Sequence, residues 1–270
     1  MTQEERRRYL LKYLLSEQEQ YREMELSDSP EEQWKLFRAL CNVRPPEPVS
    51  DEFLAIQDAF LQEESRRRGI VALEDLSAAD STAPFDRVYL WRGDITTLQC
   101  GAIVNAANSA LLGCFSPLHG CIDNAIHTYA GIQLRLACAE LMQKQGHEEP
   151  TGLAKITEAY NLPSEYVIHT VGPIVSGSLT PRHETLLRSC YRSCLETATE
   201  HGISSVAFCC ISTGVFHFPP ERAARIAVQT VRDYLSTKDQ TLEVIFNVFV
   251  RSDERLYQRI LREESGRGME

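Results

Sequence analysis

The first 85 residues alternate helical apolar patterns with polar turns. In three segments apolar side chains recur every three or four residues, as they do along one face of an α-helix. These faces are formed by Tyr9, Leu10, Tyr13 and Leu14, by Trp34, Phe37, Leu40 and Cys41, and by Phe53, Ile56, Phe60 and Leu61. Ser29 before Pro30, and Ser50, are typical of helix starts, and Gly69 is typical of a helix end. We interpret the three faces as packing surfaces.

After Phe85 the pattern changes to short apolar runs that alternate with longer helical ones, which is typical of a layered α/β domain. The predicted strands are Val88–Trp91, Ala102–Asn105, Tyr166–Val171, Val206–Ile211 and Val244–Val250. The predicted helices are Ile122–Gln145, Arg182–His201, Glu221–Leu235 and Glu254–Glu263. Residues 77–84, rich in Ser and Ala, are the predicted linker. We therefore expect an acidic helical extension, residues 1–85, followed by one α/β domain, residues 86–270.

Composition and charge exclude several classes of protein. The chain has 270 residues and no apolar run long enough to span a membrane. Because it begins without a signal-peptide pattern, we expect a cytoplasmic protein whose nine cysteines are thiols, metal ligands or core residues. The net charge is −10, of which residues 1–85 carry −7 (11 basic, 18 acidic) and residues 86–270 carry −3 (17 basic, 20 acidic). Nucleic acid is therefore an unsuitable partner, and any bound phosphate must be held largely by backbone amides.

Three segments that follow predicted strands carry candidate binding residues, since ligands bind beyond the carboxyl ends of strands in open α/β sheets. Asp94 is suited to accept a hydrogen bond from an exocyclic amine, or to cap a turn. Asn105 and Asn108 flank two alanines, and each needs a ligand or neighbouring backbone as partner. The segment 211–216 contains Ser, Thr and Gly just before a helix, which suits an anion nest or an ordinary turn. It has no Lys, which excludes a Walker-type site.

A candidate metal site lies in a loop with two glycines and a proline. Cys114, His119 and Cys121 fall within eight residues of one another, and two thiolates with one imidazole suit zinc with a fourth position left open. The alternative is that both cysteines are small core residues and that His119 is a turn residue. Because core cysteines belong on strand or helix faces, we favour the metal site.

Taken together, these segments resemble the macrodomain family of ADP-ribose-binding modules. The matching stretches are 93–96, Val104–Asn108, 122–127, 167–173 and 211–216 followed by Phe218-Pro219, so the resemblance covers residues 86 to about 262. It implies a three-layer α/β/α sandwich around a mixed sheet. Where hydrolytic macrodomains usually carry a glycine-rich stretch, this chain has the longer loop 113–122 with its Cys/His set. In this it looks like the zinc-containing subclass, which in bacteria is often linked to a sirtuin-type mono-ADP-ribosyltransferase and a lipoyl-carrier protein.

The resemblance also implies roles for particular residues. Asp94 and the Ile95 amide would recognise adenine, with Phe249 as a stacking partner. The diphosphate would lie on the amides of Ile122 and of the loop that contains Ser212, Thr213, Gly214, Val215 and Phe216, with Phe216 also packed on the distal ribose. Asn108 would bind a distal-ribose hydroxyl, and Asp123 would orient or deprotonate the reacting group. One zinc ion on Cys114, His119 and Cys121 would activate water or hold the distal ribose.

The function expected from this resemblance is zinc-dependent hydrolysis of mono-ADP-ribose esters on Asp or Glu side chains of a protein, with neither nucleic acid nor membrane as partner. One alternative is a reader module that binds ADP-ribosylated proteins without cleaving them. Another is a deacetylase of O-acetyl-ADP-ribose. The same pocket would serve all three, so the residues alone leave these alternatives open.

Overall fold

A six-stranded mixed sheet forms the centre of the computed structural model, which describes residues 1–79, 84–237 and 241–266. Its strands are β2 (Val88–Arg92), β8 (Glu243–Val248), β7 (Ser205–Phe208), β4 (Ala102–Ala107), β6 (Tyr166–Val171) and β5 (Ala154–Glu158), in that spatial order. All neighbours are parallel except β5, which runs antiparallel to β6. The chain order reverses around β4, whose neighbours are β6 and β7, and ligands of such sheets bind at this kind of switch point.

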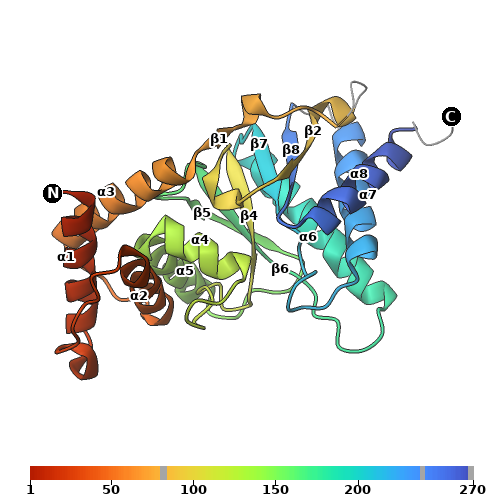
Figure 1. Cartoon of the computed structure of the whole chain (residues 1–270). Coiled ribbons are helices and arrows are strands. Elements are labelled where there is room, and N and C mark those ends of the chain that lie inside the picture. The colour runs from red at the N-terminus through yellow and green to blue at the C-terminus, as the bar shows by residue number, and fades with distance from the viewer. Residues whose placement is uncertain (80–83, 238–240, 267–270) are drawn as a thin grey trace.

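Helices cover both faces of the sheet, which confirms the three-layer α/β/α sandwich. Figure 1 shows α4 (Ile122–Ala130) and α5 (Ile132–Gln145) on one face, and α6 (Pro181–Glu200), α7 (Pro220–Thr237) and α8 (Arg251–Glu264) on the other. The central strands are buried on both faces: Ile103 and Val104 of β4 and Val206 and Ala207 of β7 are fully buried. Within the described residues, no helix has the length and apolar character needed to cross a membrane.

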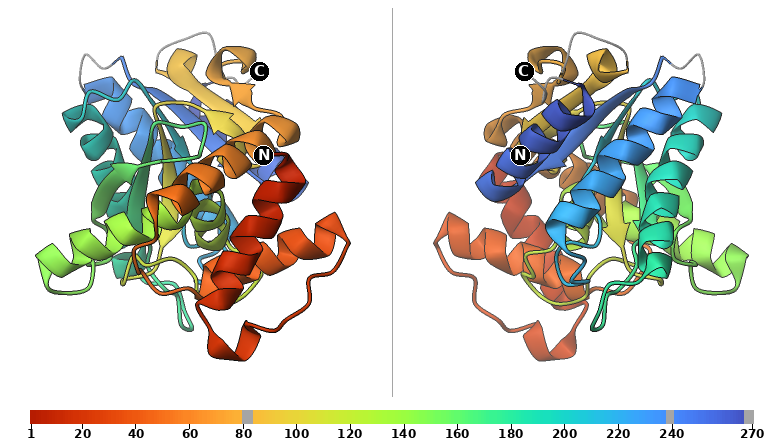
Figure 2. Two further views of the ribbon diagram at one scale, coloured as in Figure 1. Left: turned by 90° about the vertical axis from the view of Figure 1, so that its left-hand side faces the viewer. Right: turned by 90° about the vertical axis from the view of Figure 1, so that its right-hand side faces the viewer.

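The N-terminal extension folds into three helices and the short 3-10 turn Glu19–Tyr21. They are α1 (Gln3–Ser16), α2 (Pro30–Val43) and α3 (Asp51–Arg68), and the predicted caps are confirmed: Ser29 Oγ accepts from the Glu32 amide and Ser50 Oγ from the Phe53 amide. Figure 2 shows the extension packed on the side of the sheet that carries α4 and α5.

A second apolar core holds the extension together and joins it to the sheet domain. It contains the inward residues of α1, α2 and α3 together with Ile132 of α5. The rings of Trp34 (α2) and Tyr129 (α4) stack with centroids 5.5 Å apart, across the junction between the two parts. Beyond α3, the strand β1 (Val71–Ala72) pairs in parallel with β3 (Leu98–Gln99). The extension is therefore fixed to the wall formed by α4 and α5.

The structure differs from the sequence predictions at several boundaries. The predicted helix Ile122–Gln145 is two helices, because Gly131 between them has φ +93° and ends α4. The strand β5 was not predicted; it is short, at the sheet edge and mostly half-buried. The predicted strands Val206–Ile211 and Val244–Val250 end early, at Phe208 and Val248. Of the predicted linker, residues 80–83 lie outside the described residues, while Ala78 forms an isolated bridge with Tyr89 of β2.

The break at Gly131 generates a stability prediction. A Cβ at this position would lie 2.6 Å from both Gln57 Nε2 and Gln133 Oε1, two atoms that hydrogen-bond each other at the same distance. Gly131→Ala should therefore add a steric clash to the cost of a left-handed backbone. Gly69→Ala is the closer control, since Gly69 has φ +87° and ψ 116°, also outside the αL region, but open space around its Cβ. We expect Gly131→Ala to lower the free energy of unfolding by at least ~1 kcal/mol more than Gly69→Ala, whose backbone strain costs about 1–3 kcal/mol. Urea denaturation measures both, and equal losses would contradict the argument.

Candidate active site

A cavity of about 540 Å³ lies beyond the carboxyl ends of the central strands. The residues that directly follow β2, β6, β7 and β8 all contribute to its wall. It is lined by residues 93–95, 120–122 and 212–216, and by Arg38, Ala106, Ala125, Tyr129, Gly172, Cys209, Cys210, Asn247, Phe249 and Asp253. The structure therefore brings the three strand-end segments singled out in the sequence to one place.

The loop 212–216 presents unpaired backbone amides to this cavity. The amides of Gly214, Val215 and Phe216 donate to no described residue, whereas those of Thr213 and His217 bond back within the loop to Cys210 and Gly214. Such a run of free N–H groups is suited to binding an anion. Its shape depends on a left-handed residue, Ser212, with φ +65°, whose buried Oγ has no partner among the described residues.

The N-terminus of α4 forms another part of the cavity wall. Cys121 is the N-cap of α4, and its Sγ accepts from the Asn124 amide at 3.4 Å. The Ile122 amide, in the first turn of α4, has no acceptor among the described residues, and Ile122 lines the cavity. The partial positive charge of a helix N-terminus thus acts on the same cavity as the loop amides.

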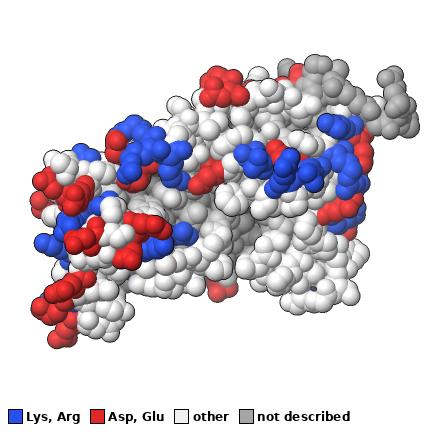
Figure 3. Space-filling view, viewed as in Figure 1, with Lys and Arg blue, Asp and Glu red and all other residues white. Residues whose placement is uncertain are grey.

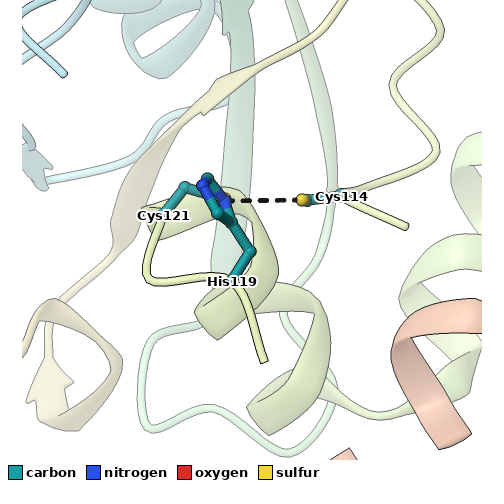
Figure 4. Close-up of side chains that lie close together, drawn as sticks. All are labelled: Cys114, His119 and Cys121. Carbon is teal, nitrogen blue, oxygen red and sulfur yellow. Dashed lines mark hydrogen bonds between the residues drawn. The ribbon is translucent and has the colours of Figure 1, made fainter. Parts of the chain in front are cut away.

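The side chains of Cys114, His119 and Cys121 converge beside this helix start (Figure 4). Cys114 Sγ lies 3.6 Å from His119 Nδ1, and the ligand atoms of all three residues lie within 4.8 Å of one another. All three residues are partly buried. Burial and the neighbouring Cys114 raise the pKa of the Cys121 thiol. The geometry brings together the predicted metal-ligand set, of which Cys121 also lines the cavity.

Asp123 and Asn108, the predicted catalytic residues, are hydrogen-bonded to one another. Asp123 is buried and accepts from Asn105 Nδ2 at 2.8 Å and from Asn108 Nδ2 at 3.4 Å. Burial raises the pKa of this carboxyl to about 6, while the bond from Asn105 opposes the shift. Asn108 also donates to the Gly113 carbonyl, at the start of the Cys/His loop. Neither residue lines the cavity itself, but Asp123 follows Cys121 and Ile122, which do.

Asp94 caps a 3-10 turn, which is one of its two interpretations from the sequence, whereas its binding of an exocyclic amine stays a prediction. Its Oδ1 accepts from the Thr96 amide and hydroxyl, while Oδ2 forms an ion pair of 2.9 Å with Arg68 of α3. Ile95 is buried against the cavity. Phe249 lines it too and is 74% exposed, so its ring is available to a ligand at the rim.

Sequence reasoning missed several residues at the site. Arg38 and Tyr129 form part of the wall, and Arg68 places its guanidinium 3.5 Å from the centre of the Tyr129 ring. Arg38 falls four residues after Trp34 and three before Cys41, so it lies on the apolar face of α2. A charged residue on a packing face was the sequence feature that could have identified it. Cys209 and Cys210 fall within the predicted strand Val206–Ile211 but follow the end of β7; Cys209 belongs to the apolar core, Cys210 packs against it, and both line the cavity.

A second cluster of potential ligands lies beneath Asp123. His127, Cys138 and His169 are buried with their ligand atoms within 4.8 Å of one another. Asn105 Nδ2 donates to His169 Nδ1 at 3.2 Å, so the ring proton is on Nε2, 3.0 Å from Thr157 Oγ1. Burial lowers the pKa of His169 to about 4 and that of His127 well below its usual value. These imidazoles are therefore neutral, and His169 helps to orient Asn105, the partner of Asp123.

Comparisons with known proteins agree with this architecture. Residues 104–227 match the family model described as "Macro domain". A "Protein-ADP-ribose hydrolase" of Treponema medium is 56% identical over 97% of this chain and 100% of that protein. One of Staphylococcus aureus (strain MSSA476) is 48% identical over 94% of this chain and 96% of that protein. The Trypanosoma brucei macrodomain, solved in complex with ADP-ribose, superposes with a TM-score of 0.65 at 32% identity, over 87% of this chain and 96% of that one.

The buried imidazole of His169 generates a pH prediction. Its pKa of about 4 in the folded protein is below the 6.5 of an unperturbed His, so the unfolded chain takes up a proton between these values while the folded one does not. Stability should therefore fall as pH drops from 6.5 towards 4. His169→Gln keeps an acceptor for Asn105 and a donor for Thr157 and should remove on the order of 3 kcal/mol of that acid-dependent loss.

Urea denaturation at several pH values between 4.5 and 7.5 measures the effect. The control is His201→Gln, since His201 is exposed and its replacement should leave the wild-type dependence in place. Stability curves for His169→Gln and the wild type that stay parallel across this range would contradict the neutral, buried state of His169.

Proposed function

The chain belongs to the Macro domain family, and from that premise we propose that it is a protein-ADP-ribose hydrolase that removes mono-ADP-ribose from ester-linked Asp or Glu side chains. The activity is that named for the relatives in Treponema and Staphylococcus. The observation that carries the proposal is the position of the Cys114, His119 and Cys121 cluster, because Cys121 and Ile122 at the start of α4 belong to the wall of a cavity that also presents free amides. In this proposal a metal centre and an anion site lie side by side.

The binding of ADP-ribose follows from the cavity wall. In this proposal Asp94 and the Ile95 amide bind adenine, and Phe249 stacks on it from the rim. The free amides of Gly214, Val215 and Phe216, with Ser212 and Thr213 shaping the loop, hold the diphosphate together with the Ile122 amide at the start of α4. Phe216 packs on the distal ribose, which would place the reactive end near Cys121.

The three-residue cluster fits a zinc ion. Two thiols and an imidazole already lie within 4.8 Å of one another without any rearrangement, and as thiolates the two sulfurs would balance the 2+ charge. Bound there by Cys114, His119 and Cys121, one zinc ion would supply Lewis acidity at the distal ribose and its ester. By contrast, we assign no ion to His127, Cys138 and His169, because Asn105 and Thr157 already hold both ring nitrogens of His169.

The chain's own groups provide acid–base chemistry and orientation. Asp123 is held by two amide donors, Asn105 Nδ2 and Asn108 Nδ2, so its carboxylate has a fixed direction. We propose that it orients or deprotonates the reacting group, a contribution of typically ~10²–10⁴-fold. Asn108, fastened to Gly113, would bind a distal-ribose hydroxyl. The resemblance to the zinc-containing subclass extends the proposal to a lipoyl-carrier protein as substrate and a sirtuin-type transferase as the opposing enzyme.

The first experiment measures turnover. Catalytic amounts of the full chain are incubated with a protein mono-ADP-ribosylated on Asp or Glu, and released ADP-ribose is quantified by mass spectrometry. Parallel samples contain a zinc chelator, or the chelator followed by excess zinc. We expect multiple turnovers that are lost on chelation and recovered with zinc. Binding of the modified protein without release of ADP-ribose in every sample would instead make the protein a reader. Hydrolysis of O-acetyl-ADP-ribose but not of the modified protein would make it a deacetylase of that small molecule.

The ligand set is tested separately by substitution. Cys114→Ala should abolish hydrolysis, because two ligands are too few to hold the ion, while ADP-ribose still binds with reduced affinity. Cys100→Ala is the matched control, since Cys100 is a buried thiol that does not line the cavity. Zinc content by atomic absorption and hydrolysis rates are compared for both variants. Hydrolysis by Cys114→Ala at the wild-type rate would disprove the zinc mechanism.

A further inference from the structure

Arg38 is the one Lys or Arg among the described residues that line the cavity, and it belongs to the N-terminal extension. The charged residues that the sheet domain contributes to the wall are acidic, Asp94 and Asp253. The cavity therefore has a single cationic side chain, and that side chain comes from α2.

The guanidinium of Arg38 is fixed by three of its five N–H groups. Nε and Nη2 donate to Asn124 Oδ1 at 3.0 and 2.7 Å, and Nη2 also donates to the His119 carbonyl at 2.7 Å. Nη1 donates to no described residue, and Arg38 forms no ion pair with a described carboxylate. A rigidly held guanidinium with two unused donors and no counter-ion is prepared for an anionic ligand.

The anchor of Arg38 places it at the start of α4. Asn124 is in the first turn of that helix, two residues after Ile122, whose amide has no acceptor in the described part of the chain. Gly120 and Cys121, from the loop that Arg38 contacts through the His119 carbonyl, line the same part of the wall. The cation and the helix N-terminus therefore favour negative charge at one place.

We infer that Arg38 binds the diphosphate of ADP-ribose, so that the extension supplies part of the nucleotide site. This inference rests on the proposed function, which provides the diphosphate. A guanidinium donates its two Nη1 protons to phosphate oxygens, and a charge-assisted bond of this kind contributes more than a neutral one. The extension is then a binding element as well as a packing element.

The test compares the affinities of ADP-ribose and adenosine, measured by isothermal titration calorimetry on the full chain. Arg38→Gln should weaken ADP-ribose roughly tenfold or more and leave adenosine, which has no phosphate, unchanged. Arg38→Lys should recover part of the loss, because it keeps the charge without the planar fork. Raising the salt concentration should weaken ADP-ribose binding more in the wild type than in Arg38→Gln.

Asn42→Ala is the matched control for loosening of the loop. Asn42 also joins α2 to the loop, since its Oδ1 accepts from the Leu118 amide at 3.0 Å, but it does not line the cavity. We expect this variant to bind ADP-ribose within about twofold of the wild type, consistent with a loss of less than ~0.4 kcal/mol. A loss as large as that of Arg38→Gln would show that Arg38 acts only through the loop and would overturn the inference.

Two further results would also overturn it: an Arg38→Gln variant that binds ADP-ribose like the wild type, or one that loses ADP-ribose and adenosine equally. Melting temperatures of all variants identify any that fail to fold, and Arg38→Lys then decides the question. Wild-type protein that binds ADP-ribose but releases none from the mono-ADP-ribosylated protein would disprove the proposed activity and leave the Arg38 comparison intact. The turnover and binding measurements therefore distinguish failure of the proposed hydrolase activity from failure of the Arg38 inference.

Discussion

Asn124 is buried and joins the three parts from which the site is built: the N-terminal extension, the loop 113–122 and α4. Its Oδ1 accepts from Arg38 of the extension, and its Nδ2 donates to the carbonyls of Ser116 and Cys114 in the loop. Its backbone amide is capped by Cys121, a member of the metal cluster. Because a buried polar group left unpaired costs about 1–3 kcal/mol, all of these partners must be in place together. The conformation of the loop therefore depends on the extension as well as on α4.

Free backbone amides are what suit the cavity to an anion in a chain of net charge −10. Figure 3 shows charges of both signs gathered over the extension, while the hollowed middle of this face is mostly uncharged. Free amides at the loop 212–216 and at the start of α4 add partial positive charge there, beside the guanidinium of Arg38. Such dipoles are fixed by the fold, so they need no reorganisation when a ligand binds.

Sequence patterns predicted those features whose cause is local. The caps Ser29 and Ser50, the apolar runs of the central strands and the Cys114, His119 and Cys121 set each depend on residues within a few positions of one another. The break at Gly131 was missed because apolar spacing continues across it, and only the left-handed backbone, closed by Gln57 from α3, ends the helix. The edge strand β5 was missed because its mostly half-buried side chains give no strong periodicity.

Contacts between the extension and the sheet domain could not be predicted from local sequence patterns. These contacts bring the extension to the cavity wall. Arg38 contacts residues more than 80 positions away, and Arg68 contacts Asp94. Tyr129 of the cavity wall is stacked on Trp34 and covered by the guanidinium of Arg68. The extension thus contacts the cavity wall at both the metal-loop end and the Asp94 end. A segment held at both ends of the candidate site, by buried hydrogen bonds and a shared apolar core, contributes to the rigidity of that site.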